Sequence, residues 1–126
     1  MKNLLFILLI LPAIAFVDFN LGDISKAISN GDADALAKYF DNRVEISIMG
    51  DEDMYNKSQA LQVVKTFFQN NKPKSYDQRH QGVSKGKDSH YAIGDLVTNK
   101  DSFRVYIYMK VENGKYIIQE LRIDKE

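Results

Sequence analysis

The stretch that decides the fold is Phe103–Ile123, FRVYIYMKVENGKYIIQELRI. In its first half, strongly apolar residues alternate with tyrosines and basic residues, and this period of two predicts a strand with one buried face. The expected buried residues are Phe103, Val105, Ile107, Met109 and Val111, and the expected outward residues are Arg104, Tyr106, Tyr108 and Lys110. Asn113-Gly114 then provides the residues that a tight type I′ turn favours, and Tyr116–Ile123 returns as a second strand. The stretch therefore predicts a β-hairpin.

The composition is that of one globular domain. The chain has 126 residues, of which 44% are hydrophobic and 27% are charged, and these values are ordinary for a folded domain. Its formal net charge is zero, so no overall field favours nucleic acid or an anionic membrane. The sequence contains no cysteine, which excludes disulfides, thiolate metal sites and cysteine nucleophiles.

Residues 1–15 have the pattern of a secretory signal peptide. Lys2 supplies a positive charge, and Leu4–Leu11 is an unbroken apolar run. Small residues near Ala15 fit a cleavage site, so we expect export to the periplasm or the cell exterior, with cleavage near this residue. The alternative is a membrane anchor, which needs about 20 apolar residues, but Asp18 closes the run early.

The rest of the chain, residues 16–126, is expected to form a single domain that begins with helices. Asn30-Gly31-Asp32 separates two short amphipathic helices, because glycine closes the first helix and aspartate caps the second. Asp23 is the expected cap of the first helix. Ser58 is the expected cap of a longer third helix, which Pro73 ends.

Strands are expected in the remaining segments. Alternating residues predict a strand over 44–48, a turn over 50–53 and a brief strand at Met54-Tyr55, all before the third helix. After that helix, strands over 76–85 and 90–98, joined by a turn at 86–88, lead into the hairpin. Helices followed by antiparallel strands make an α+β pattern, in which the helices gather on one face of the sheet.

This order of elements, together with several short motifs, resembles the nuclear transport factor 2-like superfamily. The matching motifs are Asn30-Gly31-Asp32, Phe67-Phe68, Lys72-Pro73-Lys74, His80-x-Gly82, Tyr91-Ala92-Ile93-Gly94, Phe103-Arg104-Val105 and Gln119-Glu120-Leu121-Arg122-Ile123. Within the superfamily, the chain is similar to a family of short secreted bacterial proteins of unknown function. The resemblance implies a cone-like fold, with N-terminal helices packed on one face of a curved antiparallel sheet. It implies no particular activity, because the superfamily includes isomerases, dehydratases, transport factors and association domains.

A pocket between the helices and the sheet would be the place for chemistry. Asp95 alternates in register with Tyr91 and Val97. If this face is inward, Asp95 is a buried base and Tyr91 is a hydrogen-bond donor beside it. If Ala92 and Leu96 point inward instead, Asp95 is a surface residue without a catalytic role. The sequence leaves both alternatives open.

Other residues are candidates for the lining of such a pocket. Tyr39 and Phe68 are aromatic residues of the expected helices, and Tyr91 lies on the strand just described. Gln119 falls in alternating register with Leu121 and Ile123, so it is the expected polar group of the lining. These four residues are the predicted ligand-binding set, for a small apolar ligand.

We expect neither a metal site nor a cofactor. His80 and His90 are the two histidines of the chain and lie on separate expected strands, which falls short of the three or four ligands that zinc requires. Asp51-Glu52-Asp53 lacks the central glycine and the terminal glutamate of a calcium loop. We interpret this acidic stretch as a solvated turn.

The outward residues Arg104, Tyr106 and Tyr108 form the predicted partner interface, because tyrosine and arginine are enriched in interfaces. The resemblance adds that open sheets of this fold often pair through that surface, so we expect a homodimer. We interpret the chain as an exported, non-enzymatic module for ligand binding or protein association, without nucleic acid and without a membrane after cleavage. The alternative is a small acid–base enzyme of the isomerase or dehydratase type, with Asp95 as base and Tyr91 as donor.

Overall fold

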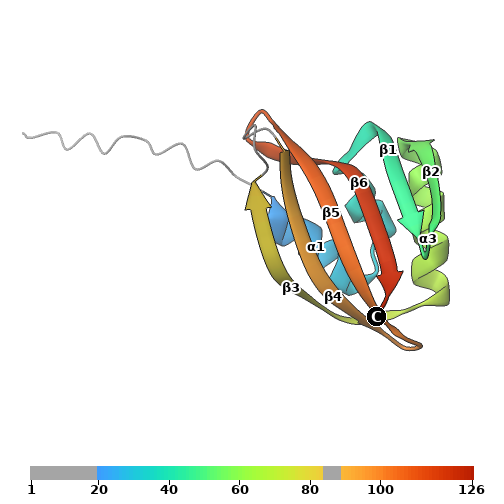
Figure 1. The fold of residues 1–126 in the computed structure, drawn as a ribbon. Coiled ribbons are helices and arrows are strands. Elements are labelled where there is room, and N and C mark those ends of the chain that lie inside the picture. The colour runs from blue at the N-terminus through green and yellow to red at the C-terminus, as the bar shows by residue number, and fades with distance from the viewer. Residues whose placement is uncertain (1–19, 84–88) are drawn as a thin grey trace, which may run out of the picture.

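The computed structural model of the chain describes residues 20–83 and 89–126 (Figure 1). The expected signal peptide and the expected turn at 86–88 lie outside the described residues. The helices within the described residues are α1 (Leu21–Asn30), α2 (Ala33–Ala37) and α3 (Lys57–Asn70). The strands are β1 (Phe40–Ile48), β2 (Asp51–Asn56), β3 (Pro73–Val83), β4 (Ser89–Thr98), β5 (Ser102–Glu112) and β6 (Lys115–Lys125). The predicted order of helices and strands is confirmed.

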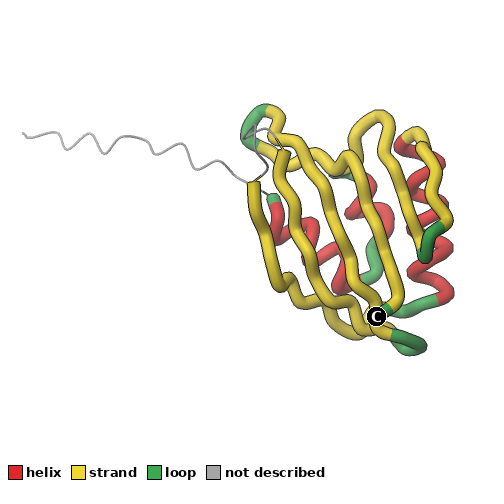
Figure 2. The backbone as a smooth tube through the Cα atoms, viewed as in Figure 1, coloured by secondary structure: helices red, strands yellow, loops and turns green. Residues whose placement is uncertain are grey.

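The described strands form one sheet of six, in the order β2-β1-β6-β5-β4-β3. Neighbouring strands are antiparallel, except that β1 and β6 run parallel. The described helices all lie against one face of the curved sheet, and none of them covers the opposite face (Figure 1, Figure 2). We call the helix-covered face the inner face and the other the outer face. β6 and β5 take the two central positions, so the predicted hairpin is the centre of the sheet.

The first two helices meet at the predicted Asn-Gly-Asp junction. Gly31 closes α1 with a φ of 64°, in the left-handed region that glycine favours. The Asp32 carboxylate accepts a hydrogen bond of 3.0 Å from the backbone N–H of Ala35, as a helix N-cap does. The expected break between two short helices is therefore confirmed.

The predicted caps of the other two helices are wrong. α1 begins at Leu21, so Asp23 lies within its first turn rather than before it. α3 begins one residue before Ser58 and is capped by Asn56, whose side chain accepts a hydrogen bond of 2.8 Å from the Gln59 backbone N–H. The Gln59 side chain in turn accepts one from the Asn56 backbone N–H, which completes a capping box.

Two hairpins of the sheet close through two-residue turns of the same form. Asn113 and Gly114 have φ angles of 52° and 74°, and Met49 and Gly50 have φ angles of 50° and 87°. Positive φ at both turn positions is the type I′ pattern, whose twist matches that of the strands. The predicted turn at Asn113-Gly114 is confirmed. The predicted turn over 50–53 is wrong, because β2 already begins at Asp51.

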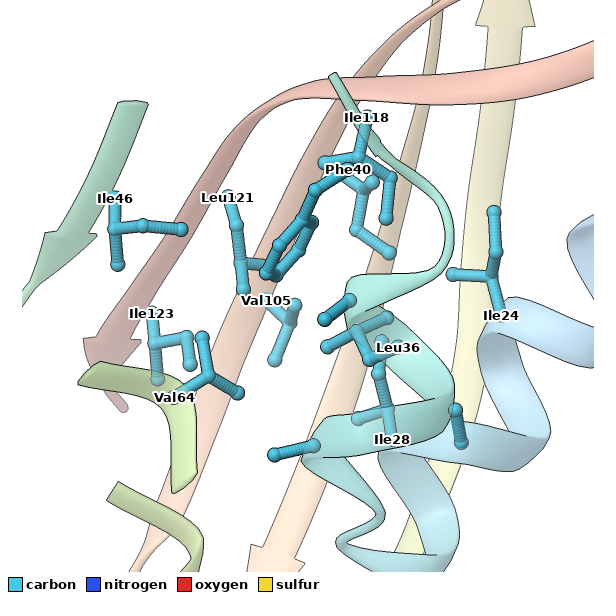
Figure 3. Close-up of a cluster of buried hydrophobic side chains, with 14 of the residues drawn as sticks. Ile24, Ile28, Leu36, Phe40, Ile46, Val64, Val105, Ile118, Leu121 and Ile123 are labelled. Atoms are coloured by element: carbon cyan, nitrogen blue, oxygen red, sulfur yellow. The ribbon is translucent and has the colours of Figure 1, made fainter. Parts of the chain in front are cut away.

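The core fills the space between the helices and the inner face. The inner face of β5 contributes four side chains that are at most 1% exposed, namely Phe103, Val105, Ile107 and Met109. Figure 3 shows labelled side chains of the three helices gathered against those of β1, β5 and β6. Phe67 of α3 meets Phe103 edge to face, with ring centroids 5.1 Å apart. Because each large apolar side chain that is fully buried contributes about 1.5–3 kcal/mol, this contact layer dominates stability.

Asn20 joins the start of α1 to the sheet. Its buried side-chain oxygen accepts a hydrogen bond of 2.7 Å from the Tyr116 N–H, and its side-chain amide donates one of 3.5 Å to the Tyr116 carbonyl. The side-chain amide thereby satisfies both backbone groups of Tyr116 on that side of β6. Within the described part of the chain, no helix is long and apolar enough to cross a membrane.

Candidate interaction surface

The register of β4 decides where Asp95 points. Ala92 pairs with Ile107 of β5, and both side chains are buried against the helices. Asp95 pairs with Arg104 on the outer face. Of the two alternatives that the sequence leaves open, the structure shows the one in which Asp95 is a surface residue.

Asp95 is held by two arginines. Its Oδ2 accepts a hydrogen bond of 2.8 Å from Arg79 Nε, and its Oδ1 lies 3.4 Å from a terminal nitrogen of Arg104. Hydrogen bonding with the Glu126 carboxyl and with Arg79 lowers the pKa of the Asp95 carboxyl. The acid–base alternative needs a desolvated carboxyl with a raised pKa, and this environment does the opposite.

Tyr91 does not complete a catalytic pair with Asp95. Both residues lie on the outer face of β4, but they are four positions apart, so their Cα atoms are separated by about 13 Å at 3.3 Å per residue. The Tyr91 ring lies over Gly82 of β3 instead, where an added Cβ would overlap the ring. The predicted base and donor are therefore not in contact.

The four predicted pocket residues lie in separate places. Phe68 is buried and borders a hollow of about 340 Å³ beside the α1–α2 turn. Tyr39 borders another hollow, of about 230 Å³, along α1 and α2. Tyr91 is on the outer face, and Gln119 is exposed, with its side-chain nitrogen 3.5 Å from Asp41 Oδ2. The structure does not bring these residues together.

Gln119 leaves the expected inward register because β6 contains a β-bulge. Tyr108 pairs with Glu120, whereas the next residue of β5, Met109, pairs with Ile118. Gln119 is therefore an extra residue opposite β5, and the inward–outward alternation shifts at this point. The expected alignment of Gln119 with the buried residues further along β6 is wrong for this reason.

The predicted interface residues do lie on the outer face, at the centre of the sheet. Tyr108 pairs with Tyr91 across β5 and β4, and Tyr106 pairs with Ile93 in the same way. Tyr108 is 40% exposed. We call these four residues, Tyr91, Ile93, Tyr106 and Tyr108, the outer-face band. The paired Asp95 and Arg104 separate this band from Val97 further along β4.

Arginines border the outer-face band. The guanidinium carbon of Arg122 lies 5.9 Å from the centroid of the Tyr106 ring, within the range of a cation–π contact. Arg104 neighbours Tyr106 along β5 and reaches Asp95 and Glu126. An aromatic and aliphatic centre with charged residues at its edge is the usual anatomy of a protein interface.

Sequence reasoning missed one group of carboxylates. Glu45, Glu52 and Glu120 come from three strands, and their oxygens lie within 4.8 Å of one another on the outer face. Hydrogen bonding with Glu45 raises the pKa of the Glu52 carboxyl. This is the arrangement in the described part of the chain that comes nearest to a cation site, whereas the histidines are apart: His80 is exposed, and His90 packs on the inner side against a tyrosine ring.

The arrangement of helices and sheet defines the class of the domain, and structural comparison agrees. The structure named Rd1NTF2_04 with long sheet is similar, with 14% identity and a TM-score of 0.65 over 82% of this chain and 94% of that chain. A candidate calcium/calmodulin dependent protein kinase II association domain from Xanthomonas campestris has 13% identity and a TM-score of 0.62, over 85% and 84%. The chain therefore has the nuclear transport factor 2-like fold that its sequence predicts.

The family is also clear. Residues 21–124 match the family described as Domain of unknown function (DUF4783). A DUF4783 family protein from Bacteroides ovatus has 30% identity and a TM-score of 0.78, over 82% of this chain and 93% of that chain. The chain belongs to the DUF4783 family. No curated protein matches it in sequence.

Proposed function

We propose that the chain is a non-enzymatic association module that pairs with a second copy of itself through the outer-face band. The observation that carries the proposal is that four aromatic and aliphatic residues, half-buried or exposed, adjoin one another on a sheet face that none of the described helices covers. Contiguous exposed apolar patches mark contact surfaces, and tyrosine is prominent among the residues that dominate binding energy.

Two further observations support this proposal. The carboxylate that an acid–base enzyme would use, Asp95, forms ion pairs with Arg79 and Arg104 at the edge of the outer-face band. It therefore contributes to the charged border of an interface rather than to a desolvated pocket. The fold is also shared with the candidate association domain from Xanthomonas campestris, which is consistent with association as a role for this sheet.

Sedimentation velocity tests the proposal directly. The protein should sediment as a dimer in the micromolar range, and Tyr108→Glu should shift it to a monomer, because a carboxylate would be buried at the centre of the interface. Val83→Glu is the matched control, since Val83 is 55% exposed at the end of β3 and outside the outer-face band. A wild-type protein that stays monomeric throughout this range would refute the pairing.

We also propose that the protein is exported and cleaved near Ala15. The N-terminal apolar run ends before it reaches the length of a membrane span, and small residues that fit a cleavage site lie near Ala15. Mass spectrometry of the protein recovered from the periplasm or the medium should give a chain that begins close to Phe16. Recovery of the uncleaved chain in the membrane fraction would show that the segment is an anchor instead.

A further inference from the structure

A groove of about 560 Å³ runs between α3 and the β1–β2 hairpin. Its apolar surface comes from Ile48 and Tyr55 on the strands and from Val63 and Phe67 on the helix, and Met49 stands at its edge. The groove lies on the helix side of the sheet. It is therefore separate from the outer-face band, and a ligand there would not compete with pairing of two copies.

Met49 occupies an unusual position for its residue type. It has a φ of 50°, in the left-handed region, and its side chain is 56% exposed. Side chains other than those of glycine, asparagine and aspartate are disfavoured there. The equivalent position of the other type I′ turn is Asn113, with a φ of 52°, so turn geometry alone calls for asparagine rather than methionine.

The placement of Met49 is therefore explained better by the groove than by the turn. Residues kept in sparsely populated backbone conformations cluster at binding sites. Methionine is flexible and polarisable, which lets it adapt to the apolar group of a ligand. An exposed methionine in a disfavoured conformation, at the edge of an apolar groove, has the properties of a contact residue.

The charged and polar residues around the groove indicate which chemical class of ligand it would bind. Asp51 is the one charged residue among those that line it, and the exposed Asp53 follows two positions on, on the same face of β2. The helix side of the groove contributes neutral polar groups, such as Gln62 and Thr66. An apolar floor beside an acidic edge is complementary to an apolar group with a neighbouring positive charge.

We propose that this groove binds a short segment of a partner protein in which an aromatic or aliphatic side chain is flanked by lysine or arginine. The apolar side chain packs against Val63 and Phe67, with Met49 closing over it. The flanking cation lies near Asp51. The groove is open to solvent rather than enclosed, so a peptide segment fits it better than an enclosed small molecule does.

Peptide titrations followed by NMR test the proposal. The probes are three capped pentapeptides, Gly-Lys-Phe-Lys-Gly, Gly-Glu-Phe-Glu-Gly and Gly-Lys-Ala-Lys-Gly. The first should shift the Met49 methyl signal and the amide signals of Val63 and Phe67, and the other two should bind at least tenfold more weakly. Equal shifts with the glutamate peptide, shifts confined to other surfaces, or no shifts with any peptide would overturn the proposal. Saturation by indole without binding of the lysine–phenylalanine peptide would overturn it in favour of a small aromatic ligand.

Substitutions separate binding from folding. Met49→Asn should weaken the lysine–phenylalanine peptide several-fold and raise the melting temperature, because asparagine is favoured at this φ. Asp51→Asn should weaken the same peptide and reduce its salt dependence. Asn113→Met is the matched control, since it places the same residue in the other type I′ turn and should lower the melting temperature without affecting binding. Unchanged binding in both Met49→Asn and Asp51→Asn would overturn the assignment.

Discussion

β3 and β4 make the same tyrosine–glycine contact twice, once on each face of the sheet. On the inner face, the Tyr76 ring lies over Gly94, and on the outer face the Tyr91 ring lies over Gly82. In both places an added Cβ would overlap the ring, so each glycine leaves the space that a tyrosine occupies. The two contacts differ in what surrounds the ring.

The inner ring is enclosed and the outer ring is not. The Tyr76 hydroxyl is buried and has no hydrogen-bond partner among the described residues. Tyr91 belongs to the outer-face band and is only half-buried, on a face that no described helix covers. Substitution of the glycine is therefore expected to be tolerated on the outer face and to be destabilising on the inner face, because only the outer tyrosine ring is free to move aside.

The largest effect is expected from Gly94→Val. The new side chain would overlap the Tyr76 ring, which the core holds in place, and overpacking of this kind costs about 3 kcal/mol of unfolding free energy. Urea unfolding measures the loss. The control is the same substitution in a Tyr76→Ala background, where the cost should be clearly smaller. An equal cost in both backgrounds would show that the ring is not the cause.

The second largest effect is expected at alkaline pH, where the Tyr76 hydroxyl should lower the unfolding free energy. Burial raises the pKa of the Tyr76 hydroxyl above its ordinary value of 10.0, so the native state keeps a proton that the unfolded chain releases. The stability that depends on this proton is fully present below pH 10.0 and is lost as the pH rises further, at up to about 1.4 kcal/mol per pH unit. Unfolding curves for wild type and Tyr76→Phe between about pH 9 and about pH 11 isolate the effect. Equal slopes for the two proteins would contradict the assignment.

Removal of the Tyr76 hydroxyl at neutral pH should stabilise the protein. A buried hydroxyl without a partner is unfavourable, so Tyr76→Phe should raise the unfolding free energy by roughly 1 kcal/mol. Thermal and urea unfolding both measure the gain. Tyr91→Phe should change stability by less than about 0.5 kcal/mol, as surface substitutions usually do. Destabilisation by Tyr76→Phe would mean that its hydroxyl has a partner in solution.

The smallest effect is expected from Gly82→Ala. The added methyl group overlaps the Tyr91 ring, but this ring can turn toward solvent. Alanine also loses less backbone entropy than glycine on folding, by about 0.5–1 kcal/mol, which offsets the displacement. The net change in unfolding free energy should stay within about 0.5 kcal/mol. A loss as large as that of Gly94→Val would show that the outer ring is as rigid as the inner one.

The difference between β5 and β4 explains which parts of the fold the sequence predicts. The alternation of Phe103, Val105 and Ile107 with tyrosines is strong enough to fix both faces of β5. β4 carries apolar residues on both faces, such as Leu96 inside and Ile93 outside, so its pattern does not say which face is inward. Pairing with β5 decides this question, and pairing is a tertiary property.

The other features that the sequence did not predict correctly also have physical causes. The bulge at Gln119 reverses the alternation without a glycine or other local signal. The prediction of Ser58 as a cap is wrong because Asn56 is an equally good cap two residues earlier, and only the backbone shows which residue precedes the helix. The carboxylate group of Glu45 and Glu120 depends on the parallel pairing of β1 and β6, which joins distant parts of the chain and leaves no local trace in the sequence.

The position of β6 has a consequence for how the protein is made. β6 lies between β1 and β5, yet it follows every other described element in the chain. During synthesis, the β1–β2 hairpin therefore has no strand to join until β6 emerges, and pairings between such distant segments form slowly. A chain that stops before Lys115 would hold two separate groups of strands rather than a smaller version of the domain, so the last-made strand turns these parts into one folding unit.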